Sequence, residues 1–368
     1  MNKKSMVVIW LVMGVVAAFA APTISDVKVT PVAPWGMAID YTVSGAVAED
    51  ANVPLVVTAT DGGKTYEAIS LTGDTRCVNG AHRVMWNMAK DGITATVANG
   101  TVSVGFPRYY CVIDLSGGAN AKFYPVSYRG PSDIINTTAY KTTKLVLKYL
   151  PAGTYKMQNS GTVTLTKSFY MGLFEVTQKQ WSLVMGSNPS KFSGETRPVE
   201  RVSYNMIRGS SNGAKWPSSN AVDASSFLGK LRARTGLVFD LPTEAQWEYV
   251  CRAGTTTTYS YGNSVNGDYM WYSGNASSQT HEVGTKKPNP WGFYDLHGNV
   301  MEWCLDWNGA LVYGNDPVGP TSATKRVQRG GCWRDAAAGS SYRCEQYDWH
   351  GSRSDGDFGF RLVCPQSY

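Results

Sequence analysis

The chain has 368 residues, 43% of them hydrophobic and 17% charged, which is ordinary for a globular protein and long enough for two domains. Its net charge of +6 is spread along the sequence without a run of lysines or arginines, so a nucleic-acid-binding stripe is not predicted. The sequence lacks the short motifs of zinc proteases, serine hydrolases, P-loop proteins and dinucleotide-binding enzymes.

The N-terminus has the features of a secretory signal peptide. Lys3 and Lys4 precede an apolar run over residues 6–19, and Ala-Phe-Ala at 18–20 is a small-x-small cleavage site. The apolar run is too short for a comfortable membrane span. We therefore expect residues 1–20 to be removed near Ala20, and the mature protein to be secreted or periplasmic without a membrane span.

Residues 21–120 are predicted to form a β-sandwich domain. Short runs rich in Val, Thr, Ile and Tyr alternate with turn residues such as Asn99-Gly100, a strong hairpin signal. Repeated short strands of this kind are typical of an immunoglobulin-like sandwich. The expected strands are 24–30, 37–43, 53–60, 66–71, 94–97 and 101–113. Because Gly, Ser, Asn, Pro and Thr dominate residues 121–141, that segment is predicted to be a linker.

Residues 142–368 combine few helices with much irregular chain, which places the whole protein in the α+β class. A hairpin is expected at 145–157, with its second arm at 162–169. Capping boxes at Thr177 and Thr243 predict the starts of two helices, and a third is expected over about 220–235. The chain after Gly254 is rich in turn residues, with isolated short strands.

The densest cluster of functional side chains lies in residues 291–307, which contain three tryptophans, a histidine and three carboxylates. Asp295 and Glu302, with carbonyls freed by the Gly298-Asn299 turn, are hard oxygen donors of the kind that calcium uses. The alternative is a packed, loop-rich corner without an ion. His297, between the two carboxylates, is predicted to be packed or hydrogen-bonded and not a ligand.

This cluster also resembles a known signature. Residues 292–303, Gly-Phe-Tyr-Asp-Leu-His-Gly-Asn-Val-Met-Glu-Trp, are similar to the signature of the formylglycine-generating enzyme (sulfatase-modifying factor) family. Companion motifs follow the family order: Phe-Glu-Val-Thr at 174–177, Pro-Val-Glu-Arg-Val-Ser at 198–203, Leu-Pro-Thr-Glu-Ala-Gln-Trp-Glu-Tyr at 241–249, Arg-Gly-Gly at 329–331 and Gly-Phe-Arg at 359–361. The resemblance spans about 142–364 and implies a C-type-lectin-like fold.

The resemblance also implies structural calcium. One site would take side-chain and backbone oxygens from four residues, Asp295, Gly298, Val300 and Glu302. A second family site would begin at Asn275 and Ala276, although its downstream partners do not align cleanly.

Seven cysteines in an exported chain make disulfides plausible. Cys77 and Cys111 are the only two before residue 251, so a bridge within the N-terminal domain is expected. The resemblance implies a second bridge between Cys251 and Cys364, the latter displaced by two residues from the family position. The pairing of Cys304, Cys332 and Cys344 is left open.

The oxidases of this family bind copper(I) with two cysteines that follow Arg-Gly-Gly. In this chain those two positions are held by Asp335 and Ser340, and neither side chain replaces a soft thiolate toward copper(I). Copper is therefore not expected. A relocated catalytic pair, Cys332 and Cys344, is the alternative, against a disulfide or two unrelated thiols.

The segment 333–358 is predicted to be a ligand-binding surface. It has no period of 2 or 3.6, and Tyr, Trp, Arg, Ser and Gly are typical of adaptable binding surfaces. A solvated loop is the alternative. The candidate ligand-binding residues are Trp333, Arg334, Asp335, Ser340, Tyr342, Tyr347, Trp349, His350, Arg353 and Asp355.

Two functions follow from these features. The first is a non-catalytic protein that binds a peptide, protein or glycan, without nucleic acid as a partner. The second is a formylglycine-generating-type oxidoreductase, or another enzyme of the family, acting on a protein cysteine. Some proteins of this fold are targets of diversity-generating retroelements, and Arg, Asp, Ala, Gly, Ser, Cys, His and Tyr, which occur at 332–358, are reachable from asparagine codons by adenine changes. The protein sequence alone does not decide that hypothesis.

Overall fold

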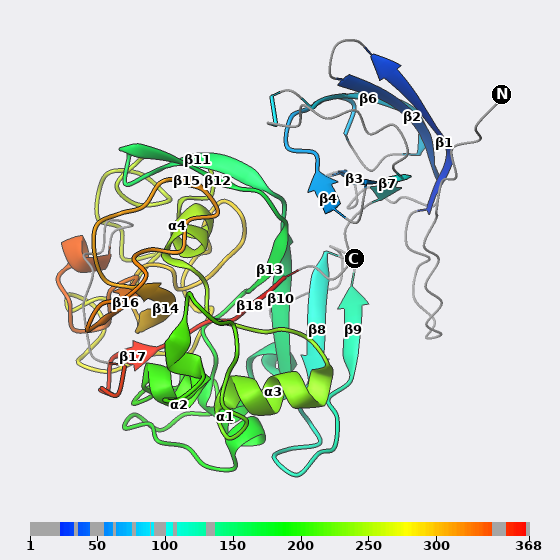
Figure 1. Ribbon diagram of the computed structural model, residues 1–368. Coiled ribbons are helices and arrows are strands. Elements are labelled where there is room, and N and C mark those ends of the chain that lie inside the picture. The colour runs from blue at the N-terminus through cyan, green and yellow to red at the C-terminus, as the bar shows by residue number, and fades with distance from the viewer. Residues whose placement is uncertain are drawn as a thin grey trace.

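The computed structural model describes residues 23–32, 36–44, 55–61, 64–75, 79–88, 90–91, 101–105, 109–129, 137–340 and 351–365. The predicted signal peptide, Cys77 and the predicted strand 94–97 lie outside these residues. Figure 1 shows the N-terminal strands as a lobe separate from the larger C-terminal domain.

The N-terminal lobe consists of two antiparallel sheets. One has the order β1-β2-β6-β5 and the other β4-β3-β7. Their strands are β1 (Thr23–Val32), β2 (Gly36–Ser44), β3 (Val56–Asp61), β4 (Lys64–Glu67), β5 (Leu71–Gly73), β6 (Gly80–Asn87) and β7 (Thr101–Gly105). Ile39, Val57 and Trp86, from three different strands, meet in one apolar core. Two sheets around one core agree with a sandwich, and its immunoglobulin-like assignment stays a prediction.

The predicted boundary between the two domains is wrong. β8 (Tyr110–Asp114) pairs with β10 (Lys144–Leu150), and β9 (Val126–Arg129), inside the predicted linker, pairs with β8. The physical reason is that β8 is buried on both faces. Tyr110 lies in one core cluster of the C-terminal domain and Cys111 lies in the other. Such a strand needs a packed layer on each side, so it belongs in the middle of the larger domain.

The centre of the C-terminal domain is a sheet of order β18-β13-β10-β8-β9, completed by β13 (Phe169–Gly172) and β18 (Val363–Pro365). Helices α1 (Gln178–Met185), α2 (Tyr204–Arg208) and α3 (Phe227–Thr235) supply Trp181, Tyr204, Phe227 and other members of one cluster. Helix α4 (Glu244–Arg252) supplies Trp247 and Val250 to the other cluster. The helices therefore pack on different faces of the sheet.

The two predicted capping boxes are confirmed. The Thr177 and Thr243 side chains accept hydrogen bonds from the backbone N–H groups of Gln180 and Gln246. The side chains of these two glutamines in turn accept from the backbone N–H groups of Thr177 and Thr243. Helix α3 begins at Phe227, later than predicted, because Ser226 caps it. The tight hairpin is β11 (Gly153–Met157) with β12 (Gly161–Leu165), whereas β10 pairs with β13.

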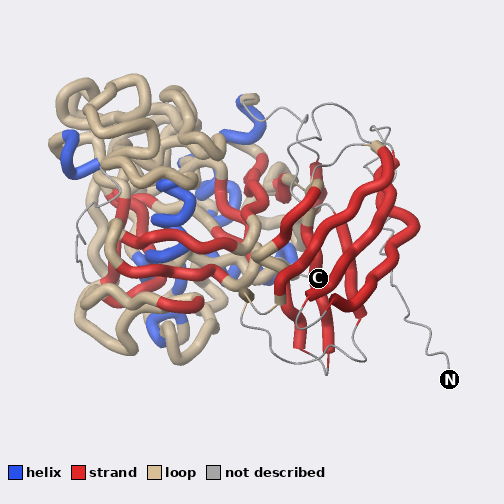
Figure 2. Tube along the Cα trace, turned by 90° about the horizontal axis from the view of Figure 1, so that it is seen from above, coloured by secondary structure: helices blue, strands red, loops and turns tan. Residues whose placement is uncertain are grey.

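The remaining elements are short and joined by long loops, as Figure 2 shows. They are β14 (Met301–Trp307), β15 (Gly314–Asn315), β16 (Arg326–Arg329), β17 (Phe358–Gly359) and the 3-10 turns η2 (Thr138–Lys141), η3 (Gly213–Lys215) and η4 (Ala337–Ser340). β14 pairs antiparallel with β16 and parallel with β17. This small sheet fixes both ends of the predicted ligand-binding segment.

Candidate functional site

The signature segment 291–307 is a tightly turned corner that leads into β14. Asp295, Gly298 and Asn299 have φ values of 56°, 89° and 64°, in the left-handed region. A Cβ at Gly298 would clash with the Trp271 carbonyl, so only glycine fits there. The turn brings Asn299 against Trp271, whose carbonyl accepts the Asn299 N–H at 2.9 Å.

Glu302 is held by a buried arginine. Arg361 donates from Nε to Glu302 Oε2 at 2.6 Å and from Nη2 to Oε1 at 2.5 Å, and both side chains are buried. Trp247 Nε1 also donates to Oε2, at 2.7 Å. Both oxygens of Glu302 are therefore occupied by donors from α4 and from the Gly-Phe-Arg motif.

Two further buried carboxylates surround this pair. Glu175 accepts from Asn299 Nδ2 at 2.7 Å and from the Val300 N–H at 3.1 Å, and Asp295 accepts from the Gly284 N–H at 2.7 Å. Burial raises the pKa of Glu175, and it raises the pKa of Asp295 to about 6. The positive charge of Arg361 lowers the pKa of both carboxyl groups, so Arg361 is the main cation of the cluster.

This arrangement differs from the predicted calcium site. A calcium ion needs free carboxylate oxygens, whereas Arg361 already places a positive charge against Glu302. At the second predicted site, Asn275 Oδ1 accepts from the Tyr272 N–H at 3.0 Å, and the Ala276 carbonyl pairs with His281 at 2.9 Å. These side chains do not fit a calcium cage, and among the described residues no three His, Cys, Asp or Glu side chains are placed so that they could hold a metal ion together.

The predicted bridge between Cys251 and Cys364 is wrong. Both are free, buried thiols, and they lie in different core clusters. Val363 faces the cluster of Cys251, so strand alternation turns the neighbouring Cys364 to the opposite face of the sheet. Cys251 Sγ lies 3.8 Å from His297 Nε2, which also accepts from the Ser260 N–H at 3.2 Å. His297 is thus a packed, hydrogen-bonded side chain.

The predicted bridge between Cys77 and Cys111 has one partner outside the described residues. Cys111 lies on β8, within the core of the C-terminal domain and not in the N-terminal lobe. The bridge was predicted because both cysteines were assigned to the N-terminal domain, and that assignment does not hold for Cys111.

The positions expected to hold copper cysteines form a compact turn. Asp335 Oδ2 accepts from the Cys332 N–H at 3.0 Å and lies 3.2 Å from Cys332 Sγ. Ser340 ends η4. Cys332 is fully buried, and burial, together with Asp335 and Asp357, raises the pKa of its thiol. A carboxylate, a hydroxyl and a protonated thiol do not fit copper(I), which selects soft thiolates. Cys344 lies outside the described residues.

The described part of the predicted binding segment is anchored by aromatic and ionic contacts. The Trp333 ring packs edge-to-face with Phe192, with centroids 5.4 Å apart, and its Nε1 donates to the Gly356 carbonyl at 3.0 Å. Arg334 pairs with the buried Asp357 at 2.5 Å. Arg353 and Asp355 pair at 3.5 Å. Tyr342, Tyr347, Trp349 and His350 lie outside the described residues.

Several residues of this surface were missed by the sequence reasoning. Asp357 lies just before the Gly-Phe-Arg motif, and burial raises its pKa to about 6. Phe192 and Glu200 come from the loop after α1, and the Phe192 N–H donates to Glu200 at 2.8 Å. The Ser273 N–H donates to the Asp335 carbonyl at 2.9 Å, which brings in the loop before residue 275. Glu200, inside the Pro-Val-Glu-Arg-Val-Ser motif, and Asp357, inside the predicted segment 333–358, carried a sequence signal.

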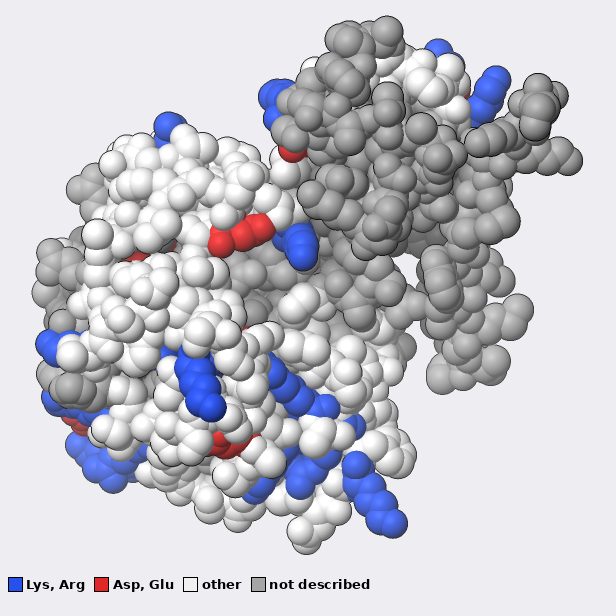
Figure 3. All heavy atoms as spheres, in the orientation of Figure 1, with Lys and Arg blue, Asp and Glu red and all other residues white. Residues whose placement is uncertain are grey.

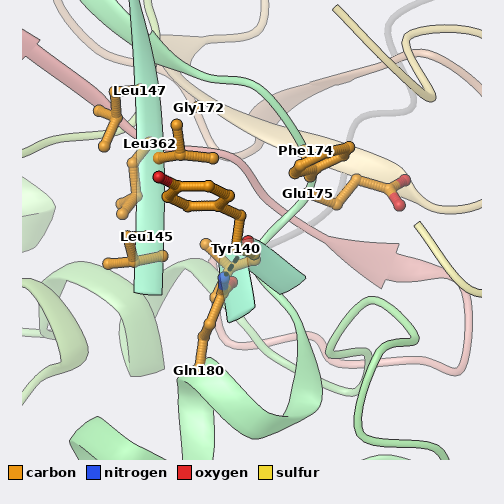
Figure 4. A pocket seen from close by; sticks show the side chains of 10 residues that line it. Tyr140, Leu145, Leu147, Gly172, Phe174, Glu175, Gln180 and Leu362 are labelled. Carbon is orange, nitrogen blue, oxygen red and sulfur yellow. Dashed lines mark hydrogen bonds between the residues drawn. The ribbon is translucent and has the colours of Figure 1, made fainter. Parts of the chain in front are cut away.

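A cavity of about 10 Å³ lies elsewhere, between η2, β10 and α1. That volume is at the lower limit for a single water molecule, about 10–15 Å³. Figure 4 shows the Tyr140 ring within it, with the Glu175 carboxylate directed away from that ring. Gln180 Nε2 donates to the Tyr140 carbonyl at 3.1 Å. This is a packing gap and not a ligand site.

The fold and its buried acid–arginine core define a loop-rich α+β domain of the sulfatase-modifying type. The profile of the sulfatase-modifying factor enzyme 1-like domain matches residues 134–365, and the chain belongs to that family. Within the described residues, no helix has the length and apolar character needed to cross a membrane.

Three relatives illustrate the range of this family. The chaperone protein LppX of Paenibacillus barcinonensis is 33% identical over 249 residues, covering 54% of this chain and 82% of its own. The formylglycine-generating enzyme of Mus musculus is 36% identical over 110 residues, covering 25% of this chain and 30% of the enzyme. The structure of Treponema denticola variable protein 1 superposes with a TM-score of 0.50 at 27% identity, covering 63% of this chain and 98% of that one. The chain thus matches less than a third of the mouse enzyme's length.

Proposed function

We propose that this chain is a non-catalytic binding protein of its family, which recognises a peptide, protein or glycan through residues 333–358. The proposal rests on the residues found at the two positions where the oxidases of the family have copper-binding cysteines. Asp335 and Ser340 stand where the oxidases have cysteines, and the Asp335 carboxylate closes a turn against Cys332. The buried Cys332 thiol meets neither requirement of a copper ligand, exposure and thiolate character.

The same residues suit recognition. Trp333 is held rigidly by Phe192 and Gly356, and Arg334 by Asp357, so both side chains are ordered before any ligand arrives. Ordering of this kind lowers the entropy lost on binding. The structural similarity to Treponema denticola variable protein 1 supports a binding role, because that protein is named for its variability.

Two finer points belong to the proposal. The predicted signal peptide sends the protein out of the cytoplasm, and retroelement diversification acts on the codons of 332–358. Sequencing the DNA around the gene tests the second point. A neighbouring reverse transcriptase with a template copy that differs at adenines supports it, and the absence of both removes it.

The proposed function is tested with the purified mature protein and the variant Trp333→Ala. Metal analysis and incubation of a cysteine-containing peptide with oxygen should give neither stoichiometric copper nor an aldehyde product by mass spectrometry. Peptide and glycan arrays should give signals that Trp333→Ala removes and that Lys28→Gln, on β1 of the N-terminal lobe, retains. Aldehyde formation, or array signals unchanged by Trp333→Ala at equal thermal stability, would contradict the proposal.

A further inference from the structure

We infer that the surface made by Lys191, Phe192, Arg201, Trp333 and Arg334, termed the cationic rim, binds a carboxylate-rich segment of a partner protein. This inference rests on the proposed function, because it names the chemistry of the ligand that the same surface would take. It concerns residues from two separate parts of the chain, of which only Trp333 and Arg334 belong to the predicted binding segment.

The cationic rim is one continuous surface. Phe192 and Trp333 pack against each other, and Lys191 Nζ lies 5.0 Å from the centre of the Phe192 ring. Gly356 sits between them, since a Cβ there would come within 3.6 Å of Lys191 and 3.8 Å of Phe192. The Arg201 N–H donates to the Asp355 carbonyl at 2.9 Å, which ties its loop to the same segment.

The acidic groups of this region are already engaged. Asp335 accepts from the Cys332 N–H, and Asp355 accepts from the Gly356 N–H at 2.8 Å. Asp357 is buried beneath Arg334. Glu200 is buried as well and accepts from the Phe192 N–H, and its burial raises its pKa. The buried Glu200 and Asp357 therefore hold the loops together, and the partly exposed Asp355 is paired with Arg353 at 3.5 Å.

The lysine and arginine side chains of the cationic rim are exposed to solvent. Lys191 and Arg201 are exposed and act on the buried Glu200, whose pKa they lower, but neither has a carboxylate within salt-bridge distance among the residues described. The side chain of Arg334 is 43% exposed, although one of its nitrogens is held by Asp357. Figure 3 shows Lys and Arg side chains gathered on the lower half of this domain, with fewer acidic ones beside them.

The backbone conformation of Arg201 also supports a functional role for this residue. Its φ is 59°, in a region that non-glycine residues rarely adopt and that is enriched at functional sites. The contact with Asp355 ties this backbone turn to the segment 351–358. The exposed guanidinium of Arg201 offers the planar fork of donors that matches a carboxylate.

A protein segment fits this surface better than nucleic acid. Binding of single strands relies on open aromatic faces that stack bases, whereas Phe192 and Trp333 are half-buried and packed against each other. Half-buried aromatics flanked by arginine and lysine are typical of protein interfaces, where a few anchors carry most of the affinity. Charge complementarity then selects an acidic partner.

The test uses the full mature protein and three fluorescein-labelled decapeptides, rich in glutamate, glutamine or lysine, with one central leucine. Fluorescence anisotropy should show binding of the glutamate peptide alone, weakened by added salt. The double variant Lys191→Gln/Arg201→Gly should weaken that binding about tenfold, since each cation contributes a partly screened contact. Glycine suits the left-handed backbone at 201, so this variant should keep the fold.

The control is Lys28→Gln/Lys90→Gln, which removes two exposed positive charges from the N-terminal lobe and should leave the affinity unchanged. Equal loss in this control would assign the binding to net charge and overturn the inference. So would the absence of glutamate-peptide binding at millimolar protein concentration, or a preference for the lysine or glutamine peptide. If arrays still give ligands that Trp333→Ala abolishes, only the acidic partner is refuted and the proposed function stands.

Discussion

Replacing Arg361 with methionine tests the claim that this arginine neutralises the acidic core. Arg361 is fully buried and makes two hydrogen bonds to Glu302, besides donating to the Gly172 carbonyl at 3.1 Å and the Tyr294 carbonyl at 2.9 Å. Methionine fills much of the same volume and leaves Glu302 as a buried charge near Asp295 and Glu175. Breaking a buried ion pair by removing one partner costs about 3–5 kcal/mol. A midpoint decrease of roughly 6–20 °C follows for a domain of this size.

The assay is urea and thermal unfolding followed by tryptophan fluorescence at pH 7 and pH 5. Without Arg361 the pKa of Asp295, which burial raises to about 6, should rise further, so its protonation should shrink the stability deficit of Arg361→Met at pH 5. Glu302→Gln/Arg361→Met should recover most of the loss, because it removes both charges together. Arg83→Met, which breaks the exposed pair with Asp40, is the control and should leave the midpoint unchanged.

If a structural calcium ion held this core, removing it would lower the unfolding midpoint in the same assay. With Arg361 paired to Glu302, EDTA should not lower the midpoint of the wild-type protein. A decrease of several degrees with EDTA that added calcium reverses would refute the reasoning, as would an Arg361→Met deficit below about 1 kcal/mol, the level of an ordinary surface pair.

Three further outcomes are expected. Burial raises the pKa of Asp306 to about 8, far above its unfolded value, so the native state holds the extra proton and stability should fall as pH rises from about 4 to 8. Asp306→Asn should flatten that slope in unfolding measured across this range, and an unchanged slope would contradict the assignment. The thiols of Cys251 and Cys364 should react with a thiol reagent only after denaturation without reductant, whereas a bridge would leave them unreactive. Thr243→Ala should lower the stability of the domain by about 1 kcal/mol in urea titration, because it removes the α4 cap, and no loss would show that tertiary packing alone fixes this helix end.

The local features of the fold were predictable because short-range chemistry determines them. Thr177 and Thr243 cap their helices through residues three positions away, and such pairs are visible in the sequence. The turn at Gly298 and Asn299 was likewise predictable from backbone preference. These signals located two helices and the corner that supports β14.

Long-range pairing was not predictable in the same way. β8 carries apolar residues on both faces, but the sequence does not say which two layers cover them. The pairing of Glu302 with Arg361 joins residues 59 positions apart, so the carboxylate was assigned to calcium instead. Asp357 had no motif of its own, although it is the buried partner of the predicted ligand-binding Arg334.

Two of the buried arginines, Arg329 and Arg361, explain how one fold supports a changeable surface. Arg329, just before the predicted binding segment, donates to Glu244 at 3.0 Å and to Glu248 at 2.7 Å on α4. Arg361, just after it, is held by Glu302. Both ends are thus fixed by ion pairs that lie outside the segment, so exposed substitutions within it should not disturb the core. Arg353→Ala should therefore leave the unfolding midpoint nearly unchanged, whereas Arg329→Met should lower it by several degrees, since it leaves the buried Glu244 without its cation and Glu248 with Arg252 alone. Equal destabilisation by the two variants would show that the segment is part of the core and is not a surface mounted on it.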